Sequence, residues 1–216
     1  MIARTTRHPP QPSRLGEHPV KPMPQPSHLP QQLTAEACAS CFVRRRCDAC
    51  FEELVRRYQT PLLHYLNRRT RCREEAEDLL QETFLIVYRS VEQYQPTWRF
   101  STWLFTIANR LAISHWRRKQ VIRSANEQLE QRSSVDPSQP LQAQEMRSRL
   151  WDIAQETLEP DAVAGLWLSY VESMSAEEIG HVLQRSANAV RILLFRARAK
   201  LQERLGPAWQ TMGDAR

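Results

Sequence analysis

The stretch Ser175–Ser186, SAEEIGHVLQRS, decides the fold class of this chain. Ser175 is placed to cap a short helix, and Glu178, three residues later, can reach back to the cap as in a capping box. The residues of this helix that are expected to face inward are Ile179, Val182 and Leu183. Residues 184–186 then form a short turn, at whose end Ser186 can cap a second helix. The stretch therefore predicts two helices joined by a tight turn.

The second helix of this pair is expected to run to about Arg204 and to be strongly basic. Its inner stripe consists of Val190, Leu194, Ala197 and Leu201. Its exposed face carries Arg191, Arg196, Arg198, Lys200 and Arg204, against Glu203 as a single acid. Arginine can bind phosphate oxygens or a guanine edge with two parallel hydrogen bonds. The pair is interpreted as a DNA-docking helix-turn-helix, with a solvated charged face on an ordinary helix as the alternative.

Further upstream, the block from Phe51 to Arg118 is predicted to form three helices, because apolar residues recur there at three and four positions. The first helix has the stripe Phe51, Leu54, Val55, Tyr58, Leu62 and Tyr65. The second, from Glu74 to about Tyr94, has the core stripe Leu80, Phe84, Val87 and Val91. Ser101 is expected to cap the third, whose inner face is Leu104, Ile107, Ala108 and Leu111.

The segment from Gln95 to Arg123 combines basic and aromatic residues and contains no Asp or Glu. Its cations are Arg99, Arg110, Arg117, Arg118, Lys119 and Arg123, and its rings are Trp98, Phe100, Trp103, Phe105 and Trp116. Rings stack on unpaired bases for about 1–3 kcal/mol each, while cations hold phosphates. The segment indicates binding to single-stranded nucleic acid, although helical spacing alone would place Trp103 and Phe105 in a core.

The helix before this segment has the opposite charge. Its acids are Glu74, Glu75, Glu77, Asp78 and Glu82. Acids in a first turn suit the helix dipole, which is the simple explanation. A helix this acidic would repel DNA, however, so a basic protein partner explains it better.

The composition favours an all-α protein with a polyanionic partner. The chain has 216 residues, a formal net charge of +6 and only five glycines. No apolar run approaches the roughly 20 residues needed to span a bilayer, and no signal peptide is recognisable. The chain is therefore expected to be cytoplasmic, without membrane insertion. It is also expected not to be an enzyme, because it shows no nucleophile–base pair, Gly-rich phosphate loop or paired carboxylates.

Three strings, in this order, resemble the extracytoplasmic-function (ECF) sigma factors, which direct bacterial RNA polymerase to promoters. AEDLLQETF, residues 76–84, resembles their core-polymerase-binding helix. FSTWLFTIANRLAISHWRR, residues 100–118, resembles their helix for the minus-ten promoter element. Residues 174–201, ending in RARAKL, resemble their C-terminal helix-turn-helix for the minus-thirty-five element. The resemblance covers nearly everything from Phe51 to Leu205.

The resemblance implies two small helical domains joined by a flexible linker. The expected parts are a disordered Pro-rich tail at 1–33, a Cys-rich segment at 34–50, sigma region 2 at 51–118, the linker at 119–147, sigma region 4 at 148–206 and a tail at 207–216. The alternative is a stand-alone helix-turn-helix regulator, responsive to metal or redox state through its cysteines. That reading leaves the acidic helix and the basic, aromatic segment unexplained.

The resemblance also implies roles for individual residues. Core RNA polymerase would contact Asp78, Gln81 and Glu82. Opening of promoter DNA at the minus-ten element would use Tyr94, Trp98, Arg99, Arg110, Arg117 and Arg118. The minus-thirty-five element would be read by Arg191, Ile192, Phe195, Arg196 and Arg198. Where the family often has Asn, this chain has Arg110, with Asn109 one place earlier. No cofactor is required, and an anti-sigma factor is a further candidate partner because the family commonly has one.

Four cysteines lie directly before the first folded block, outside the family pattern. Cys38, Cys41, Cys47 and Cys50 have the spacing C-x2-C-x5-C-x2-C. Two C-x2-C pairs can supply four thiolates to zinc. The same thiols can instead form disulfides as a redox sensor or be inert, and the spacing leaves all three readings open.

Overall fold

The computed structural model describes residues 30–125 and 142–206, and within these ranges the chain is helical with no strand. The elements are η1 (Pro30–Gln32), α1 (Ala35–Arg45), α2 (Asp48–Thr70), α3 (Arg73–Ser90), η2 (Val91–Gln93), α4 (Phe100–Ala125), α5 (Gln142–Thr157), α6 (Pro160–Tyr170), α7 (Ala176–Leu183) and α8 (Ala187–Leu205). The all-α prediction is confirmed. None of these helices combines the length and the apolarity that crossing a membrane would require.

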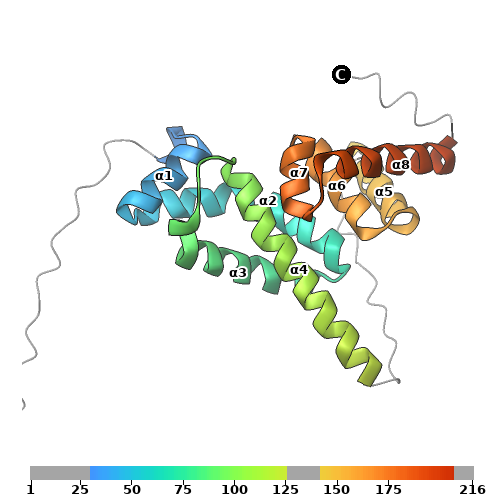
Figure 1. Cartoon of the computed structure of the whole chain (residues 1–216), viewed down its shortest axis with the longest axis horizontal. Helices are drawn as coiled ribbons and strands as arrows, with labels where there is room; N and C mark the ends of the chain where they lie inside the picture. The colour runs from blue at the N-terminus through green and yellow to red at the C-terminus, as the bar shows by residue number, and fades with distance from the viewer. Residues whose placement is uncertain (1–29, 126–141, 207–216) are drawn as a thin grey trace, which may run out of the picture.

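Helices α1 to α4 form an N-terminal lobe (Figure 1). The ring of Tyr65 on α2 meets the ring of Phe105 on α4 edge-on, with centroids 5.1 Å apart. Its hydroxyl donates a hydrogen bond of 3.0 Å to Oδ1 of the buried Asn109. Helix α3 packs against both α2 and α4, and its residues Leu79 and Val87 are buried. The core of this lobe is therefore apolar, with one buried polar link between α2 and α4.

The Cys-rich segment is folded as part of the N-terminal lobe. Thr34 caps α1, because its hydroxyl accepts a 3.2 Å hydrogen bond from the backbone N–H of Ala37. Phe42 of α1 is fully buried, and its ring lies 5.0 Å from that of Phe51 and 5.4 Å from that of Tyr88. The packed lobe therefore extends upstream of Phe51, where the sequence alone suggested that it begins.

Helices α5 to α8 form the C-terminal lobe. The inner stripe expected for α8 is buried in full, with Val190, Leu194, Ala197 and Leu201 at most 5% exposed. The inner residues expected for α7, Ile179, Val182 and Leu183, are also buried. Both helices are amphipathic at the helical period, so their local sequence was sufficient to predict these faces.

Several helix boundaries differ from the expected ones. Helix α4 begins at Phe100, so Ser101 lies in its first turn and not at its cap, and the buried Ser101 hydroxyl has no hydrogen-bond partner among the described residues. Helix α4 continues to Ala125 because neither Pro nor Gly interrupts it after Arg118. Helix α5 already starts at Gln142. Both ends of the expected linker are thus helical, while 126–141 and the two tails at 1–29 and 207–216 lie outside the described residues.

Candidate nucleic-acid interface

The predicted helix-turn-helix is formed by α7 and α8. The Ser175 hydroxyl accepts a 3.2 Å hydrogen bond from the Glu178 backbone N–H, and Glu178 Oε2 accepts one of 2.8 Å from the Ser175 N–H, which confirms the capping box. Gln184 ends α7 in the left-handed conformation, with φ at 56°. A Cβ atom at Gly180 would lie 2.6 Å from the carbonyl oxygen of Arg185. The close approach of the turn to α7 therefore requires glycine at this position.

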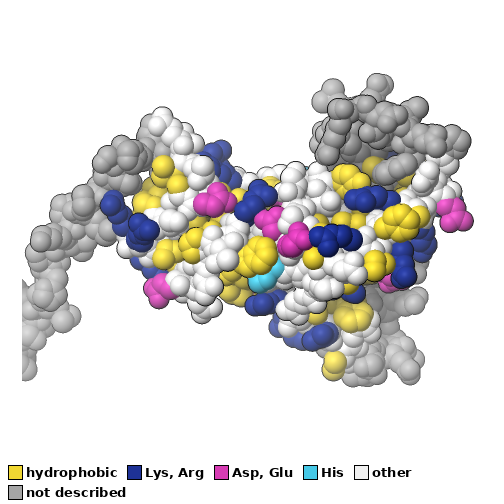
Figure 2. All heavy atoms as spheres, turned by 45° about the horizontal axis from the view of Figure 1, so that its top comes forward, with side chains coloured by type: hydrophobic (Ala, Val, Ile, Leu, Met, Phe, Trp, Pro, Cys, Tyr) yellow, Lys and Arg dark blue, Asp and Glu magenta, His cyan; other side chains and the backbone are white. Residues whose placement is uncertain are grey.

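The five residues expected to read DNA all lie on the exposed face of α8. They are Arg191, Ile192, Phe195, Arg196 and Arg198. Phe195 is 71% exposed and Ile192 is 43% exposed, so two large apolar side chains are exposed to solvent among the arginines. Figure 2 shows basic and hydrophobic side chains beside one another at this end of the molecule. A surface of this kind can bind phosphates through its cations and thymine methyl groups through its apolar side chains.

Two of these arginines already have partners within their own lobe. Arg191 forms a 2.5 Å ion pair with Glu177, and Arg198 donates a 2.9 Å hydrogen bond to the Tyr170 hydroxyl. Both pairs are exposed, so their net contribution to stability is small and DNA phosphates can replace them. For Arg196 no such pair is present among the described residues. Its guanidinium is therefore the most readily available of the three.

The loop that leads into α4 holds the residues expected to capture a base. Tyr94 is only 5% exposed, and its ring packs 5.7 Å from Phe100 and 5.5 Å from Trp103. Its hydroxyl donates a 3.1 Å hydrogen bond to the carbonyl oxygen of Trp98. The Trp98 ring stacks on His181 of α7, with centroids 5.1 Å apart and planes at 24°. Tyr94 thus stabilises the loop through a buried contact. The Trp98 ring can stack on a base only when α7 moves away from it.

The basic residues predicted along α4 lie on its exposed surface. Arg110, Arg117 and Arg118 are exposed, as is Arg99 just before the helix. Trp116, between them, is 59% exposed. The C-terminal half of α4 projects beyond the rest of the lobe (Figure 1). This half presents cations and an aromatic ring to solvent, which is the combination that binds an unpaired strand.

An open apolar groove runs between α2 and α3. It has a volume of about 510 Å³ and is lined by Phe51, Val55, Gln59, Leu80, Gln81, Phe84, Leu85 and Tyr88. Asp78, Gln81 and Glu82, the residues expected to contact polymerase, are all exposed on α3 beside it. An exposed apolar groove with acidic neighbours suits a protein partner whose surface is both apolar and basic.

The groove overturns part of the core predicted for α3. The buried face of this helix is Ala76, Leu79, Thr83 and Val87. Leu80 and Phe84, which the apolar spacing placed in the core, lie only half-buried on the groove wall. Leu85 and Tyr88, which also line the groove and are 55% and 41% exposed, are not part of the predicted stripe. The signal that could have identified them is the width of the apolar stripe, because a single core face cannot cover all of these positions.

The two lobes touch along α4 and α7. The Thr102 hydroxyl donates a 3.0 Å hydrogen bond to Oε1 of Glu178. Asn109 Nδ2 donates one of 2.9 Å to the carbonyl oxygen of Val182. Thr102 and Asn109 are both buried, so these hydrogen bonds between the lobes are shielded from solvent. Asn109, whose neighbour Arg110 is exposed, is therefore engaged in packing and does not face a nucleic acid in this arrangement.

A second contact joins α2 to the C-terminal lobe. Arg69, only 8% exposed, forms a 3.0 Å ion pair with Asp161, which also pairs at 2.6 Å with Arg185. The guanidinium of Arg68 lies 4.3 Å from the ring centroid of Trp167 and 5.1 Å from that of Trp151. Burial between these rings lowers the pKa of Arg68 to about 10, at which it remains charged at neutral pH. These contacts hold the lobes together through charge as well as packing.

Asp161→Asn is expected to loosen the contact between the lobes. Burial opposes ionisation of Asp161, but hydrogen bonds from Arg185 and Arg69 outweigh it, so the pKa of this carboxyl is below its ordinary value. Its contribution is therefore complete at neutral pH and is lost only in acid, as the pH falls through the lowered pKa. We expect a loss of about 1–2 kcal/mol of stability and a larger radius of gyration by X-ray scattering.

The control for this change is Glu156→Gln on the exposed surface of α5, which also removes one carboxylate charge. It should change neither stability nor radius by a comparable amount. Equal effects of the two substitutions would contradict a specific role for Asp161.

Comparison with known proteins agrees with this geometry. Residues 54–121 match the family Sigma-70 region 2, and residues 156–201 match Sigma-70, region 4. The chain is 39% identical over 160 residues to the RNA polymerase sigma factor CarQ of Myxococcus xanthus, covering 72% of this chain and 89% of CarQ. It is 34% identical over 160 residues to the ECF RNA polymerase sigma factor SigE of Mycolicibacterium smegmatis, covering 72% of this chain and 61% of SigE.

This chain belongs to the ECF subfamily of RNA polymerase sigma factors. The fold agrees with a solved member, the sigma factor RpoE of Bartonella quintana in complex with the anti-sigma factor NepR, with a TM-score of 0.60 at 20% identity. That comparison covers 72% of this chain and 96% of RpoE. In this sigma factor the acidic helix and the groove, except for Phe51, lie within the region 2 match, and α7 and most of α8 lie within the region 4 match.

Four of the five cysteines of this sigma factor, Cys38, Cys41, Cys47 and Cys50, lie outside both matched regions. The structure brings Cys41, Cys47 and Cys50 together, with their sulfur atoms all within 4.8 Å of one another. The fourth, Cys38, is fully buried one turn earlier on α1, and its sulfur is not within 4.8 Å of all three of the others. Burial raises the pKa of Cys38 and that of Cys50. Cys72, a single cysteine before α3, is not part of this group.

Proposed function

We propose that the two lobes of this sigma factor divide promoter recognition between them. Residues 51–118 would bind core polymerase and the minus-ten element, residues 148–206 would bind the minus-thirty-five element, and residues 119–147 would connect them. The observation that carries this proposal is the pairing of two different surfaces on one chain. One is an open apolar groove with acidic neighbours on α3, and the other is an exposed basic and apolar face on α8.

The groove is proposed as the polymerase contact. Asp78 and Glu82 are repelled by DNA phosphates, so these acids fit a protein with basic side chains. Apolar residues beside the acids, such as Leu85, lose solvent contact when that partner docks. Each square ångström of apolar surface buried contributes about 25 cal/mol, whereas charges at the rim mainly direct the encounter. Affinity would thus come from the groove and orientation from the acids.

The face formed by α4 and the loop at Trp98 is proposed to act on the minus-ten element. Arg99, Arg110, Arg117 and Arg118 would hold backbone phosphates. The Trp98 ring, with Trp116 as a second exposed ring, would stack on bases that leave the duplex. Extruding a base costs a few kcal/mol, and stacking of a base on an aromatic ring contributes about 1–3 kcal/mol. Stacking on one or two rings therefore offsets the cost.

Promoter binding of this kind requires the lobes to separate. Two DNA turns span roughly 70 Å, the distance proposed between the two elements. In the closed arrangement, α7 touches the Trp98 loop directly through His181. Both elements therefore cannot be bound while this contact persists. We infer that DNA and polymerase replace the contacts between the lobes.

We also infer that an anti-sigma factor competes for the surfaces that polymerase uses. The RpoE of Bartonella quintana is held by such a partner, and the open groove of this chain offers apolar area that a competitor could cover. A competitor of this type would displace core polymerase in a binding assay without displacing DNA from an isolated recognition helix.

The test is run-off transcription with core RNA polymerase on a library of promoters. Wild-type protein should direct starts from a defined class of promoter. Gln81→Ala/Glu82→Ala should reduce these starts by roughly tenfold or more, because two exposed contacts to polymerase are lost. The matched control is Gln202→Ala/Glu203→Ala, which makes the same change at exposed positions near the end of α8.

Two results would change the assignment. If the control variant loses as much transcription as the α3 variant, the α3 residues have no specific role in docking. If the wild-type chain binds duplex DNA but adds no specificity to core polymerase, the protein acts as a stand-alone helix-turn-helix regulator.

A further inference from the structure

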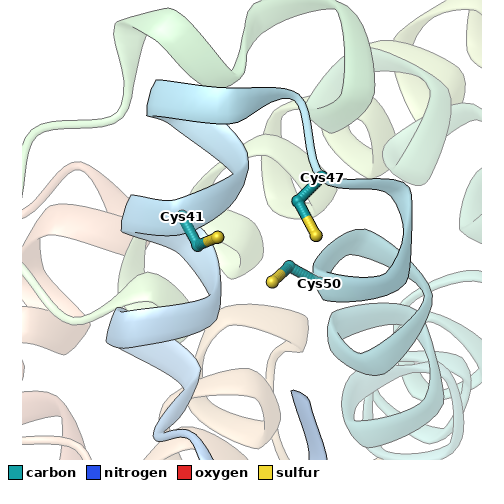
Figure 3. Close-up of side chains that lie close together, drawn as sticks. All are labelled: Cys41, Cys47 and Cys50. Atoms are coloured by element: carbon teal, nitrogen blue, oxygen red, sulfur yellow. The ribbon is translucent and has the colours of Figure 1, made fainter. Parts of the chain in front are cut away.

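The corner between α1 and α2 brings three thiols to one point. Cys41 lies on α1, Cys47 is the residue directly before α2, and Cys50 is in the first turn of α2. Their side chains point toward one another (Figure 3). All three sulfur atoms lie within 4.8 Å of one another. Around a tetrahedral zinc ion with bonds of about 2.3 Å, two sulfurs are separated by about 3.8 Å, so only a small contraction is needed.

Cys38 is in position to complete the set. It precedes Cys41 by one turn of α1, so both side chains lie on the same face of that helix. Its side chain is fully buried, and its sulfur is not within 4.8 Å of all three others, so it would have to move closer to complete the site. We propose that these four thiolates bind one zinc ion that joins α1 to the start of α2. This proposal does not depend on the roles given above to the groove and to α8.

Zinc accounts for the cluster better than a redox switch does. A reactive, disulfide-forming thiol normally lies in a partly exposed position where oxidants and partner thiols can reach it. Cys38 and Cys50 are both fully buried and only Cys41 and Cys47 are partly exposed, so two of the four thiols are out of reach of an oxidant. A disulfide would also use the sulfurs in pairs, whereas here three sulfur atoms, those of Cys41, Cys47 and Cys50, lie within 4.8 Å of one another. Three sulfurs that are all close to one another are the arrangement that a shared central ion requires.

The surroundings suit the charge of such a site. Four thiolates around a zinc ion carry a net charge of −2, because binding releases the thiol protons to solvent. Arg57 of α2 acts electrostatically on Cys38. Arg44 and Arg45, exposed at the end of α1, add positive charge to the same corner. Arg57 is also paired with Glu53 at 2.6 Å, so Arg44 and Arg45 are the cations that would offset the excess charge of the site.

The zinc ion would fix a helix that is weak by itself. Helix α1 has 11 residues, and isolated helices shorter than about 12–15 residues are marginal in water. Its Phe42 packs on Phe51 and Tyr88, which line the groove. Loss of the metal would therefore release α1 and alter one wall of the groove.

The first test uses the full chain purified under reducing conditions. We expect one zinc per chain by mass spectrometry of metals. Cobalt(II) in place of zinc should give thiolate charge-transfer absorption and the intense d–d bands of a tetrahedral site. Removing the zinc with a chelator should lower Tm by on the order of 10 °C, and added zinc should restore it. These measurements on wild-type protein need no substitution that could prevent folding.

Single substitutions then assign the ligands. Cys50→Ser should abolish stoichiometric zinc, and Cys38→Ser should weaken binding and change the cobalt spectrum. Cys72→Ser makes the same change outside the cluster and should retain both metal and spectrum. An unaltered cobalt spectrum in Cys38→Ser would overturn the four-thiolate site. Absence of stoichiometric metal in the chain purified under reducing conditions would overturn the zinc proposal as a whole. A disulfide between any two of the four cysteines in protein purified without reductant would then identify the cluster as a redox site.

Discussion

Leu85→Asp is expected to weaken binding to core RNA polymerase by about 100-fold or more, and to abolish promoter-directed transcription. Leu85 is 55% exposed on the wall of the groove, where the proposed partner would cover it. A carboxylate at this position would have to be buried without a partner charge, which costs several kcal/mol. The loss would be measured by fluorescence anisotropy with labelled sigma factor and core enzyme.

The fold should survive this substitution because the side chain does not belong to the buried face of α3. Circular dichroism and Tm should stay close to wild type, since Asp in a helix interior costs only about 0.5–0.7 kcal/mol. Val171→Asp is the matched control, because Val171 is an apolar residue with 45% exposure on the other lobe. Normal polymerase binding by Leu85→Asp would show that the groove is not the docking surface.

Arg196→Glu should reduce binding to a promoter fragment by roughly 10- to 100-fold. The reason is the loss of a contact worth about 1–3 kcal/mol, together with repulsion between the new carboxylate and DNA phosphates. Arg196 lies on the exposed face of α8, and its replacement breaks no ion pair among the described residues. The stability of the C-terminal lobe should therefore be unchanged. Electrophoretic mobility shift at several salt concentrations would measure the effect.

Arg204→Glu is the control for this second change. It makes the same charge reversal at an exposed site in the last turn of α8, away from the N-terminal part of the helix that enters a groove. It should weaken promoter binding much less. If Arg196→Glu weakens binding to promoter and to unrelated DNA equally, Arg196 contacts phosphate and does not read bases.

The closed arrangement of the lobes bears on both experiments. Trp98 and Asn109 have partners on α7 in this structure, at His181 and Val182. Substitutions in α4 would thus change DNA contacts and the contact between lobes together. Leu85 and Arg196 are more informative targets because both side chains are exposed and belong to neither contact.

The helix caps and the buried face of α8 could be predicted from the sequence. The caps at Ser175 and Ser186 and the inner stripe of α8 depend on residues within about four positions of one another, and the local sequence contains all of those interactions. The ordered strings from Ala76 to Leu201 were also sufficient to indicate the family. The exposure of Asp78 and of Arg196 follows from the same periodicity, because each lies opposite a buried stripe.

Which apolar residues are buried, and which residues far apart in the sequence contact each other, depends on the tertiary structure. Leu80 and Phe84 have the spacing of core residues, yet they line an open groove because no described helix packs over that side of α3. Tyr94 is buried under its own loop, and Trp98 meets α7, which is far along the chain. The cysteine spacing allowed metal, disulfide or inert thiols until the turn between α1 and α2 brought three sulfurs together. Contacts between segments depend on how helices pack, and helical periodicity does not contain that information.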